Sequence, residues 1–197
     1  PQLTNLQPVL KSYWLIVHVA VITVSYGFLA LGFLLGLINI FIFLFKAKSS
    51  AFRLDLIVRE LTLTNEMALI VGIMLATIGT FLGGVWANES WGRYWGWDAK
   101  ETWALVIVIT YAVILHLRFV PGLKGTFIFN VASVIGFGSV IMTFVGVNYY
   151  LSKGLHSYAA DDKKVFPLWG WGLILVLIVL MIAAGYRERL SKKQKNI

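Results

Sequence analysis

Residues 86–103 read WANESWGRYWGWDAKETW and separate two long apolar runs of the chain. This stretch, called here the Trp-rich segment, holds five of the eight tryptophans together with charged residues and two glycines. A polar stretch this dense in indole rings is not expected in a core. We expect a surface loop whose rings lie against a flat ligand, since glycine lets a ligand approach the backbone closely.

The composition is that of an integral membrane protein. Of the 197 residues, 59% are hydrophobic and 13% are charged, and the mean hydropathy is +0.80. Soluble domains carry about twice that charged fraction. The net charge of +8 does not indicate a nucleic acid partner, because the basic residues fall in short runs between apolar segments.

The chain has no cysteine, which excludes disulfides, thiolate metal sites and thioether bonds of its own. It begins at Pro1 without a signal-peptide pattern, so we expect a processed product or a piece of a longer protein. No internal repeat or low-complexity linker divides it, and residues 1–197 are treated as one membrane domain.

Five apolar runs are long enough to cross a bilayer. They cover residues 13–45, 65–85, 102–119, 126–147 and 168–186. Because the bilayer core has no water to satisfy backbone groups, each run should be a helix, and the alternation typical of barrel strands is absent. The predicted fold is an all-α polytopic bundle of about five transmembrane helices.

Lysine and arginine are distributed unevenly between the connections of these helices. Eleven of them follow the first, third and fifth helices, whereas six lie on the other side. The positive-inside rule places the larger set in the cytoplasm. The Trp-rich loop, expected at residues 86–101, then faces outward together with residues 148–167 and the N-terminus.

The first helix is longer than a bilayer requires. Its 33 residues span roughly 50 Å, against a hydrocarbon core of about 30 Å. If Phe45 marks the inner boundary, His18 stands roughly 10 Å beyond the outer one. Residues 53–60, RLDLIVRE, are charged and amphipathic, and we expect them to form a short helix on the cytoplasmic surface.

The three histidines fall at different predicted depths. His18 and His156 lie on the outer side with the Trp-rich loop, whereas His116 lies about 22 Å into the third helix, inside the membrane. Taken one at a time, His18 and His156 can be explained as solvated side chains. His116 can be explained as a side chain that reaches toward the inner membrane interface. An ionisable group at membrane depth nevertheless needs a partner or a function. Two histidines and several indoles on one face indicate a flat aromatic ligand with two axial positions, which describes heme.

Two explanations are possible for the other tryptophans of the chain and for the charged residues of the Trp-rich segment. Anchoring at the membrane interface accounts for Trp169 and Trp171, but not for the density of tryptophan in residues 86–103. Asp98 and Glu101 have the spacing of a capping box that starts the third helix, which is compatible with a functional role. Two basic residues are candidates either for pairing with heme propionates or for simple solvation: Arg93 and Lys100.

The octapeptide WGRYWGWD at residues 91–98 resembles the tryptophan-rich WWD motif of heme-handling proteins. Within that group, GVNYYLSKGLHSYA at residues 146–159 resembles the CcsA (ResC) kind, the c-type cytochrome synthase of system II. The resemblance covers nearly the whole chain. In that family one outer histidine precedes the WWD loop and another follows it, as His18 and His156 do. A further histidine lies within the membrane, as His116 does.

The resemblance implies that heme b is a substrate, which is moved outward and attached covalently to the Cys-x-x-Cys-His segment of apocytochrome c. The implied iron ligands are His18, His156 and His116. The implied catalytic residues are His18, His156, Trp91, Trp95, Trp97 and Asp98. Heme contact is implied for Trp86, Trp91, Gly92, Arg93, Tyr94, Trp95, Gly96, Trp97, Trp103 and His116.

Two departures from the family pattern bear on the expected partners. Family members usually have further helices before the segment seen here, and their membrane histidine is expected to pair with one in the CcsB (ResB) part. We therefore expect the C-terminal part of a fused CcsB–CcsA protein, or a truncated subunit, that is active only with that part. The implied location is the bacterial cytoplasmic membrane, with the site facing the periplasm, in preference to a plastid thylakoid membrane.

Two other classes of function remain open on the sequence. A b-type heme subunit that takes electrons from quinol would place histidine pairs on facing helices within the membrane, whereas two of the three histidines are predicted outside it. A transporter or channel without heme would use ionisable groups or broken helices within the spans, and the apolar runs contain few ionisable groups and no obvious broken pair.

Overall fold

The computed structural model describes residues 12–46, 51–151 and 166–195, and these residues form helices and loops with no strand. Five helices are long and apolar enough to cross a membrane. They are built from α1 (Tyr13–Phe45), α2 (Ala51–Trp91), α3 (Ala99–His116), α4 (Thr126–Ile141) with its continuation to Tyr150, and α6 (Leu168–Lys195). A short 3-10 helix, η3 (Leu117–Phe119), follows α3, and α4 continues through a π-helical turn, η4 (Met142–Gly146), into α5 (Val147–Tyr150). The prediction of an all-α, multi-pass membrane protein is confirmed.

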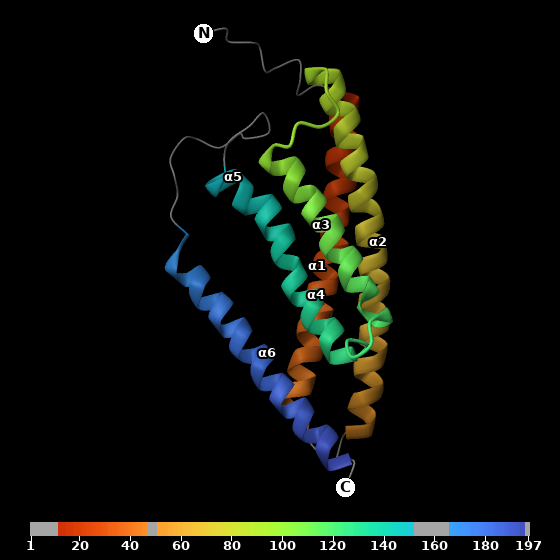
Figure 1. Ribbon diagram of the computed structural model, residues 1–197, viewed down its shortest axis with the longest axis vertical. Helices are drawn as coiled ribbons and strands as arrows, with labels where there is room; N and C mark the ends of the chain where they lie inside the picture. The colour runs from red at the N-terminus through yellow and green to blue at the C-terminus, as the bar shows by residue number, and fades with distance from the viewer. Residues whose placement is uncertain (1–11, 47–50, 152–165, 196–197) are drawn as a thin grey trace.

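The first two helices form a long antiparallel pair that runs the length of the bundle (Figure 1). α1 has the expected 33 residues, but α2 has 41 and extends beyond the predicted 65–85 at both ends. Residues 53–60 are helical as expected, yet they are the first turns of α2 and not a separate helix on the membrane surface. No glycine or proline interrupts these turns. Val58 is buried in the cluster at the end of α1, and Asp55 pairs with Lys46, so the turns pack on α1.

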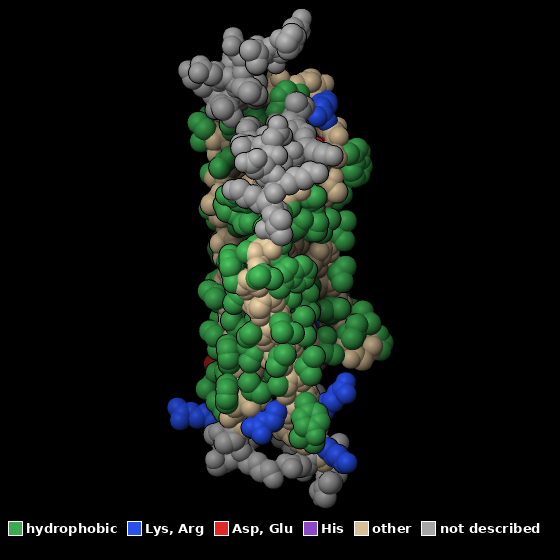
Figure 2. All heavy atoms as spheres, turned by 90° about the vertical axis from the view of Figure 1, so that its left-hand side faces the viewer, with side chains coloured by type: hydrophobic (Ala, Val, Ile, Leu, Met, Phe, Trp, Pro, Cys, Tyr) green, Lys and Arg blue, Asp and Glu red, His purple; other side chains and the backbone are tan. Residues whose placement is uncertain are grey.

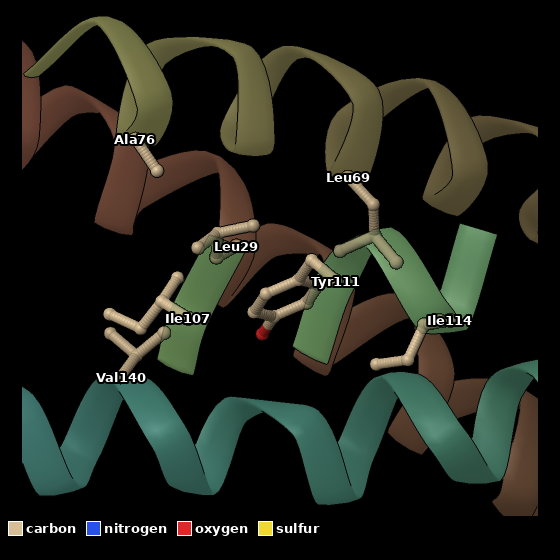
Figure 3. Close-up of a cluster of buried hydrophobic side chains, with 7 residues drawn as sticks. All are labelled: Leu29, Leu69, Ala76, Ile107, Tyr111, Ile114 and Val140. Atoms are coloured by element: carbon tan, nitrogen blue, oxygen red, sulfur yellow. The ribbon is translucent and has the colours of Figure 1, made fainter. Parts of the chain in front are cut away.

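α3 and α4 pack against this pair around a core of apolar side chains from four helices. The buried members are Leu29 of α1, Leu69 and Ala76 of α2, Ile107, Tyr111 and Ile114 of α3, and Val140 of α4. Figure 3 shows the Tyr111 ring in the middle of this cluster, where it is fully buried. The cluster, called here the core plug, fills the four-helix bundle between its two ends.

A second buried cluster is polar and joins three helices. Its members are Asn39 of α1, Thr62 and Asn65 of α2, and Asn130 and Ser133 of α4. Asn130 is central, because its Nδ2 donates to Thr62 Oγ1 (2.8 Å) and its Oδ1 accepts from Asn39 (2.9 Å) and Asn65 (3.1 Å). Interhelical hydrogen bonds of this kind supplement small-residue packing in lipid, so the cluster fixes the register of α1, α2 and α4.

The two ends of the bundle differ in chemistry. The aromatic end holds the start of α1, the end of α2 and the loop at residues 92–98. At the opposite, basic end lysine and arginine side chains gather, and a hydrophobic surface covers the length between the ends (Figure 2). α6 packs mainly on α1, where Arg187 Nε donates to the carbonyl oxygen of Leu44 (3.1 Å). An apolar band with one basic rim is the surface expected of a membrane bundle.

Candidate functional site

A cavity of about 250 Å³ opens at the aromatic end. Its wall is built from α1, α2, α3, the loop at residues 92–98 and the η4–α5 turn. Four predicted site residues line it, together with one basic side chain: His18, Trp86, Tyr94 and Trp95, with Lys100. Typical small-molecule sites enclose about 300–1,000 Å³. A ligand as large as a macrocycle would therefore be enclosed by these residues only in part.

His18 is held where α1 and α2 approach each other closely. Its Nδ1 lies 2.7 Å from the carbonyl oxygen of Gly79, and since a carbonyl only accepts, Nδ1 carries the proton. The lone pair of the neutral ring is then on Nε2, as in metal-ligating histidines that donate their other N–H to a backbone carbonyl. A Cβ atom at Gly83 would lie 2.7 Å from Cε1 and 2.8 Å from Nδ1 of the ring. Residue 83 must therefore be glycine for the His18 ring to occupy this position.

The Trp-rich loop is shorter than the expected 86–101, because α2 and α3 each take up part of that range. Gly92 has a φ of +70°, a left-handed conformation in which glycine ends a helix without steric cost. Asp98 caps α3: Glu101 N donates to Asp98 Oδ1 (2.9 Å), and Asp98 N donates to Glu101 Oε2 (3.4 Å). The predicted capping box is confirmed.

Glu101 also fixes the backbone on both sides of Trp97. Its Oε2 accepts from Gly96 N (2.6 Å) as well as from Asp98 N. Trp97 has a φ of 57°, a conformation that is costly for a bulky residue and persists only where neighbouring groups fix it. The Trp97 side chain is 71% exposed, so this fixed turn presents an indole ring at the surface.

The tryptophans form two edge-to-face pairs and not one flat sheet. Trp86 packs on Trp91 (4.8 Å between centroids, 65°) and Trp95 on Trp97 (5.8 Å, 84°), the geometry that aromatic rings favour. Trp86 is only 1% exposed and belongs to the packed interior of the aromatic end. Nε1 of Trp95 is buried, and it has no hydrogen-bond acceptor among the described residues. An acceptor on a ligand in the cavity would satisfy this donor.

Some predicted site residues do not line the cavity, among them Arg93, Gly96 and Trp103. The guanidinium group of Arg93 lies over Gly96, in the space that a Cβ atom would fill. Trp103 is tied to the η4 turn, because its carbonyl oxygen accepts from Thr143 Oγ1 (3.2 Å). These residues therefore shape the loop and the wall, whereas His18 and Trp95 reach the cavity itself.

His116 lies at the basic end and is exposed. Its Nδ1 lies 2.7 Å from the carbonyl oxygen of Ala112, one turn earlier in α3. The same argument as for His18 gives Nδ1 the proton and Nε2 the lone pair. The ring of Phe119 is 5.9 Å from the imidazole, so one aromatic neighbour accompanies this histidine at the surface.

His18 and His116 are too far apart to bind one iron atom. The 3-10 turn that follows His116 pairs with Glu66 of α2, whereas His18 contacts Gly83, 17 positions further along the same helix. At about 1.5 Å per residue, these contact points are roughly 25 Å apart. His156, the second predicted outer ligand, lies outside the described residues.

Sequence patterns do not single out three polar residues of the cavity wall, Tyr26, Thr143 and Asn148. Tyr26 lies eight positions after His18 on one face of α1, so a helical projection from that histidine would have found it. Thr143 belongs to η4, a π-helical turn of the kind that often occurs at functional sites. The local sequence carries no signal for that turn.

Comparison with known proteins places these features in a family. Residues 1–156 match the family described as Cytochrome C assembly protein. The chain is 51% identical over 162 residues to protein NrfI of Wolinella succinogenes, covering 82% of this chain and 18% of that protein. It is 40% identical over 157 residues to the cytochrome c biogenesis protein CcsA of Chlamydomonas reinhardtii, covering 80% and 44%. With CcsA of Prochlorococcus marinus strain AS9601 the identity is 38% over 177 residues, covering 79% and 57%.

The chain spans less than two thirds of the length of each of these relatives. The family match nevertheless includes α1 to α5, and with them every described residue of the cavity wall. The resemblance predicted from the WWD motif is confirmed. Since the match extends over most of its residues, the chain belongs to the cytochrome c assembly protein family.

Proposed function

We propose that this chain holds heme at the aromatic end and presents it for covalent attachment to the Cys-x-x-Cys-His segment of apocytochrome c. Heme is the substrate, with His18 as one axial ligand and His156 as the other. The aromatic end faces the periplasm and the basic end the cytoplasm, as the distribution of lysine and arginine favours. The name shared by two relatives, cytochrome c biogenesis protein CcsA, supports this assignment.

The proposal rests mainly on one observation, the position of the His18 ring in the cavity wall. The contact from Nδ1 to the Gly79 carbonyl oxygen (2.7 Å) orients the imidazole and leaves Nε2 as the coordinating atom. Two groups in the same wall suit the carboxylates of heme: the buried Nε1–H of Trp95 and the ammonium group of Lys100. The cavity would enclose one part of the macrocycle and leave the remainder accessible to a docking polypeptide.

The contribution of these residues is positioning and not acid–base chemistry. Attachment adds each thiol S–H across one vinyl C=C of heme, so that a thioether forms and no group leaves. His18 on the iron and the indoles on the ring hold the vinyl groups in a fixed place, which lowers the entropic cost of the reaction. The apocytochrome histidine then replaces one axial ligand. The chain has no thiol of its own to compete for the vinyl groups.

His116 is proposed to bind heme at the basic end before its transfer outward. Its exposure leaves room for a second ligand from a companion segment of the CcsB (ResB) kind, which would also complete the synthase. The core plug blocks the axis of the four-helix bundle. We infer that heme moves along the outer face of α3, where Ile109 and Val113 are exposed on the same side as His116.

Replacing His18 by glycine tests the proposal. In the complete system that matures cytochrome c, His18→Gly should abolish holocytochrome formation, and added imidazole should restore part of it by filling the vacant iron position. The measurement is covalent heme on the reporter cytochrome, with pyridine hemochrome quantitation of the purified protein. His156→Gly should behave in the same way.

Thr23→Ala is the matched control, because Thr23 lines the same wall of the cavity but offers no nitrogen ligand. It should mature cytochrome c as the unaltered protein does. Normal maturation by both histidine variants would exclude the axial-ligand assignment. Rapid, stoichiometric reduction of bound heme by quinol would instead favour the electron-transfer alternative.

A further inference from the structure

A second cavity, also of about 250 Å³, lies at the basic end between α2 and the segment that joins α3 to α4. Its lining includes three basic side chains and one acidic one: Arg59, Arg118, Lys124 and Glu66. The first residue of α4, Thr126, also lines it. The cavity is remote from His18. It lies near the proposed entry site, since Arg118 is two residues after His116, but none of its lining residues has a role in the proposed heme binding.

The charges of this cavity are not balanced. Glu66 pairs with Arg118 and is the more enclosed partner, with a side chain 14% exposed against 53% for the arginine. Neither Arg59 nor Lys124 forms an ion pair within residues 12–46, 51–151 and 166–195. Two cations that face one small cavity without a carboxylate partner favour an anion between them.

The start of α4 adds to this positive potential. Its N-cap residue is Gly125, which has no side chain to accept from the first N–H groups of the helix. These groups and the helix dipole favour a negative charge beside Thr126. The remaining wall consists of Thr62 and three apolar side chains, Leu63, Leu123 and Phe129. The cavity thus combines an anion site with an adjoining apolar surface.

We propose that this cavity binds the phosphate of an acidic phospholipid. Arg59, Arg118 and Lys124 line the cavity, and basic side chains beside the spans of a membrane protein lie near the phospholipid headgroups. Basic pockets between transmembrane helices at the cytoplasmic side are suited to such headgroups. Arg59 and Lys124 contact the phosphate oxygens, and the acyl chains run along the apolar wall. The site is separate from the proposed heme site, so either assignment can fail without the other.

The test measures lipid affinity by native mass spectrometry on the complete purified protein in detergent. The first phosphatidylglycerol should bind at least about tenfold more tightly than phosphatidylcholine, since each basic residue near a headgroup contributes about a fivefold gain. R59Q/K124Q should remove most of this preference. Arg118 is left in place because it pairs with Glu66. The double variant should unfold at the same temperature as the unaltered protein in phosphatidylcholine alone.

The matched control is R53Q/R189Q, which removes two cations from the same end of the bundle but none from the cavity wall. It should keep the preference for phosphatidylglycerol. An equal loss in both double variants would overturn the proposal in favour of diffuse attraction to the basic end. Displacement of bound phosphatidylglycerol by millimolar inorganic phosphate would overturn the lipid assignment and indicate a site for a soluble anion.

Discussion

His18 and His116 have the same local chemistry in different surroundings. Each ring has Nδ1 at 2.7 Å from a backbone carbonyl oxygen, and each therefore offers Nε2. The acceptor for His18 is Gly79 on another helix, whereas the acceptor for His116 is Ala112 of its own turn. One ring is fixed by tertiary structure and the other only by its own helix.

This difference bears on the two proposed heme sites. His18 is half-buried in a cavity walled by several elements, while His116 is exposed beside one aromatic ring. A preorganised ligand keeps its geometry through changes in its surroundings. We infer that the aromatic end holds the macrocycle largely by itself, and that the basic end needs groups from a companion segment.

We expect the largest effect from a substitution that displaces the His18 ring but leaves the histidine itself in place. Gly83→Ala would place a Cβ atom 2.7 Å from Cε1 of His18, and the ring must move. Because changes to the groups that orient a metal-ligating side chain reduce metal affinity by about 10- to 100-fold, heme retention should fall by about tenfold or more. Pyridine hemochrome quantitation of purified protein measures this.

Gly27→Ala is the control for that change, because it is also a glycine in a helix but has no atom within 4 Å of the added Cβ. It should retain heme fully and should, if anything, stabilise α1. Equal heme content in both variants would mean that the close contact between His18 and α2 does not position the ligand.

A smaller effect is expected at the basic end. His116→Ala should lower heme at the aromatic end by a few fold, because the entry step is slowed while the outer site is intact. Thermal stability should stay within about 0.5 kcal/mol, as is usual for exposed positions. Leu175→Ala is the control, because Leu175 is also exposed but lies on α6, away from the proposed route along α3. Unchanged heme content in His116→Ala would exclude the proposed entry site.

These contrasts also show what the sequence can and cannot predict. The spans and the capping box at Asp98 and Glu101 follow from hydropathy and local spacing, so they were predictable. The continuity of α2 through residues 53–60 was not, because an amphipathic turn packs equally well on a helix or on a membrane. The position of the His18 ring against Gly83 depends on how α1 packs on α2, which brings together residues 65 positions apart in the sequence and which no local pattern specifies.

The indole rings illustrate the same limit. Density of tryptophan in residues 86–103 predicts aromatic contact, but not which ring faces the interior. Trp86 is buried and Trp97 is exposed, although the local sequences around them are similarly polar. Which ring is buried depends on where α2 ends and on the left-handed turn at Trp97. Glu101 holds that turn by accepting hydrogen bonds from Gly96 N and Asp98 N.

A third prediction separates the two explanations of Asp98. Asparagine caps helices about as well as aspartate, so Asp98→Asn should leave the unfolding temperature nearly unchanged. Glu101→Ala should lower stability by about 1 kcal/mol, or about 2–4 °C for a chain of this size, because two hydrogen bonds of the turn are accepted by its carboxylate. Loss of heme from Asp98→Asn at unchanged stability would assign the carboxylate a direct role with the substrate.

The smallest effect is expected from removing only the hydroxyl group of Tyr111, in the core plug that separates the two histidines. The Tyr111 hydroxyl is buried, and no described residue hydrogen-bonds to it. Tyr111→Phe should therefore be neutral or stabilise the protein by up to about 1 kcal/mol, with unchanged heme at both ends. Tyr111→Ala, which leaves a void, should cost about 3–5 kcal/mol. If Tyr111→Phe instead slowed the supply of heme to His18 while stability stayed constant, the hydroxyl would lie on the transfer route. Heme would then pass through the bundle and not along the outer face of α3, and the two ends would be connected through the interior.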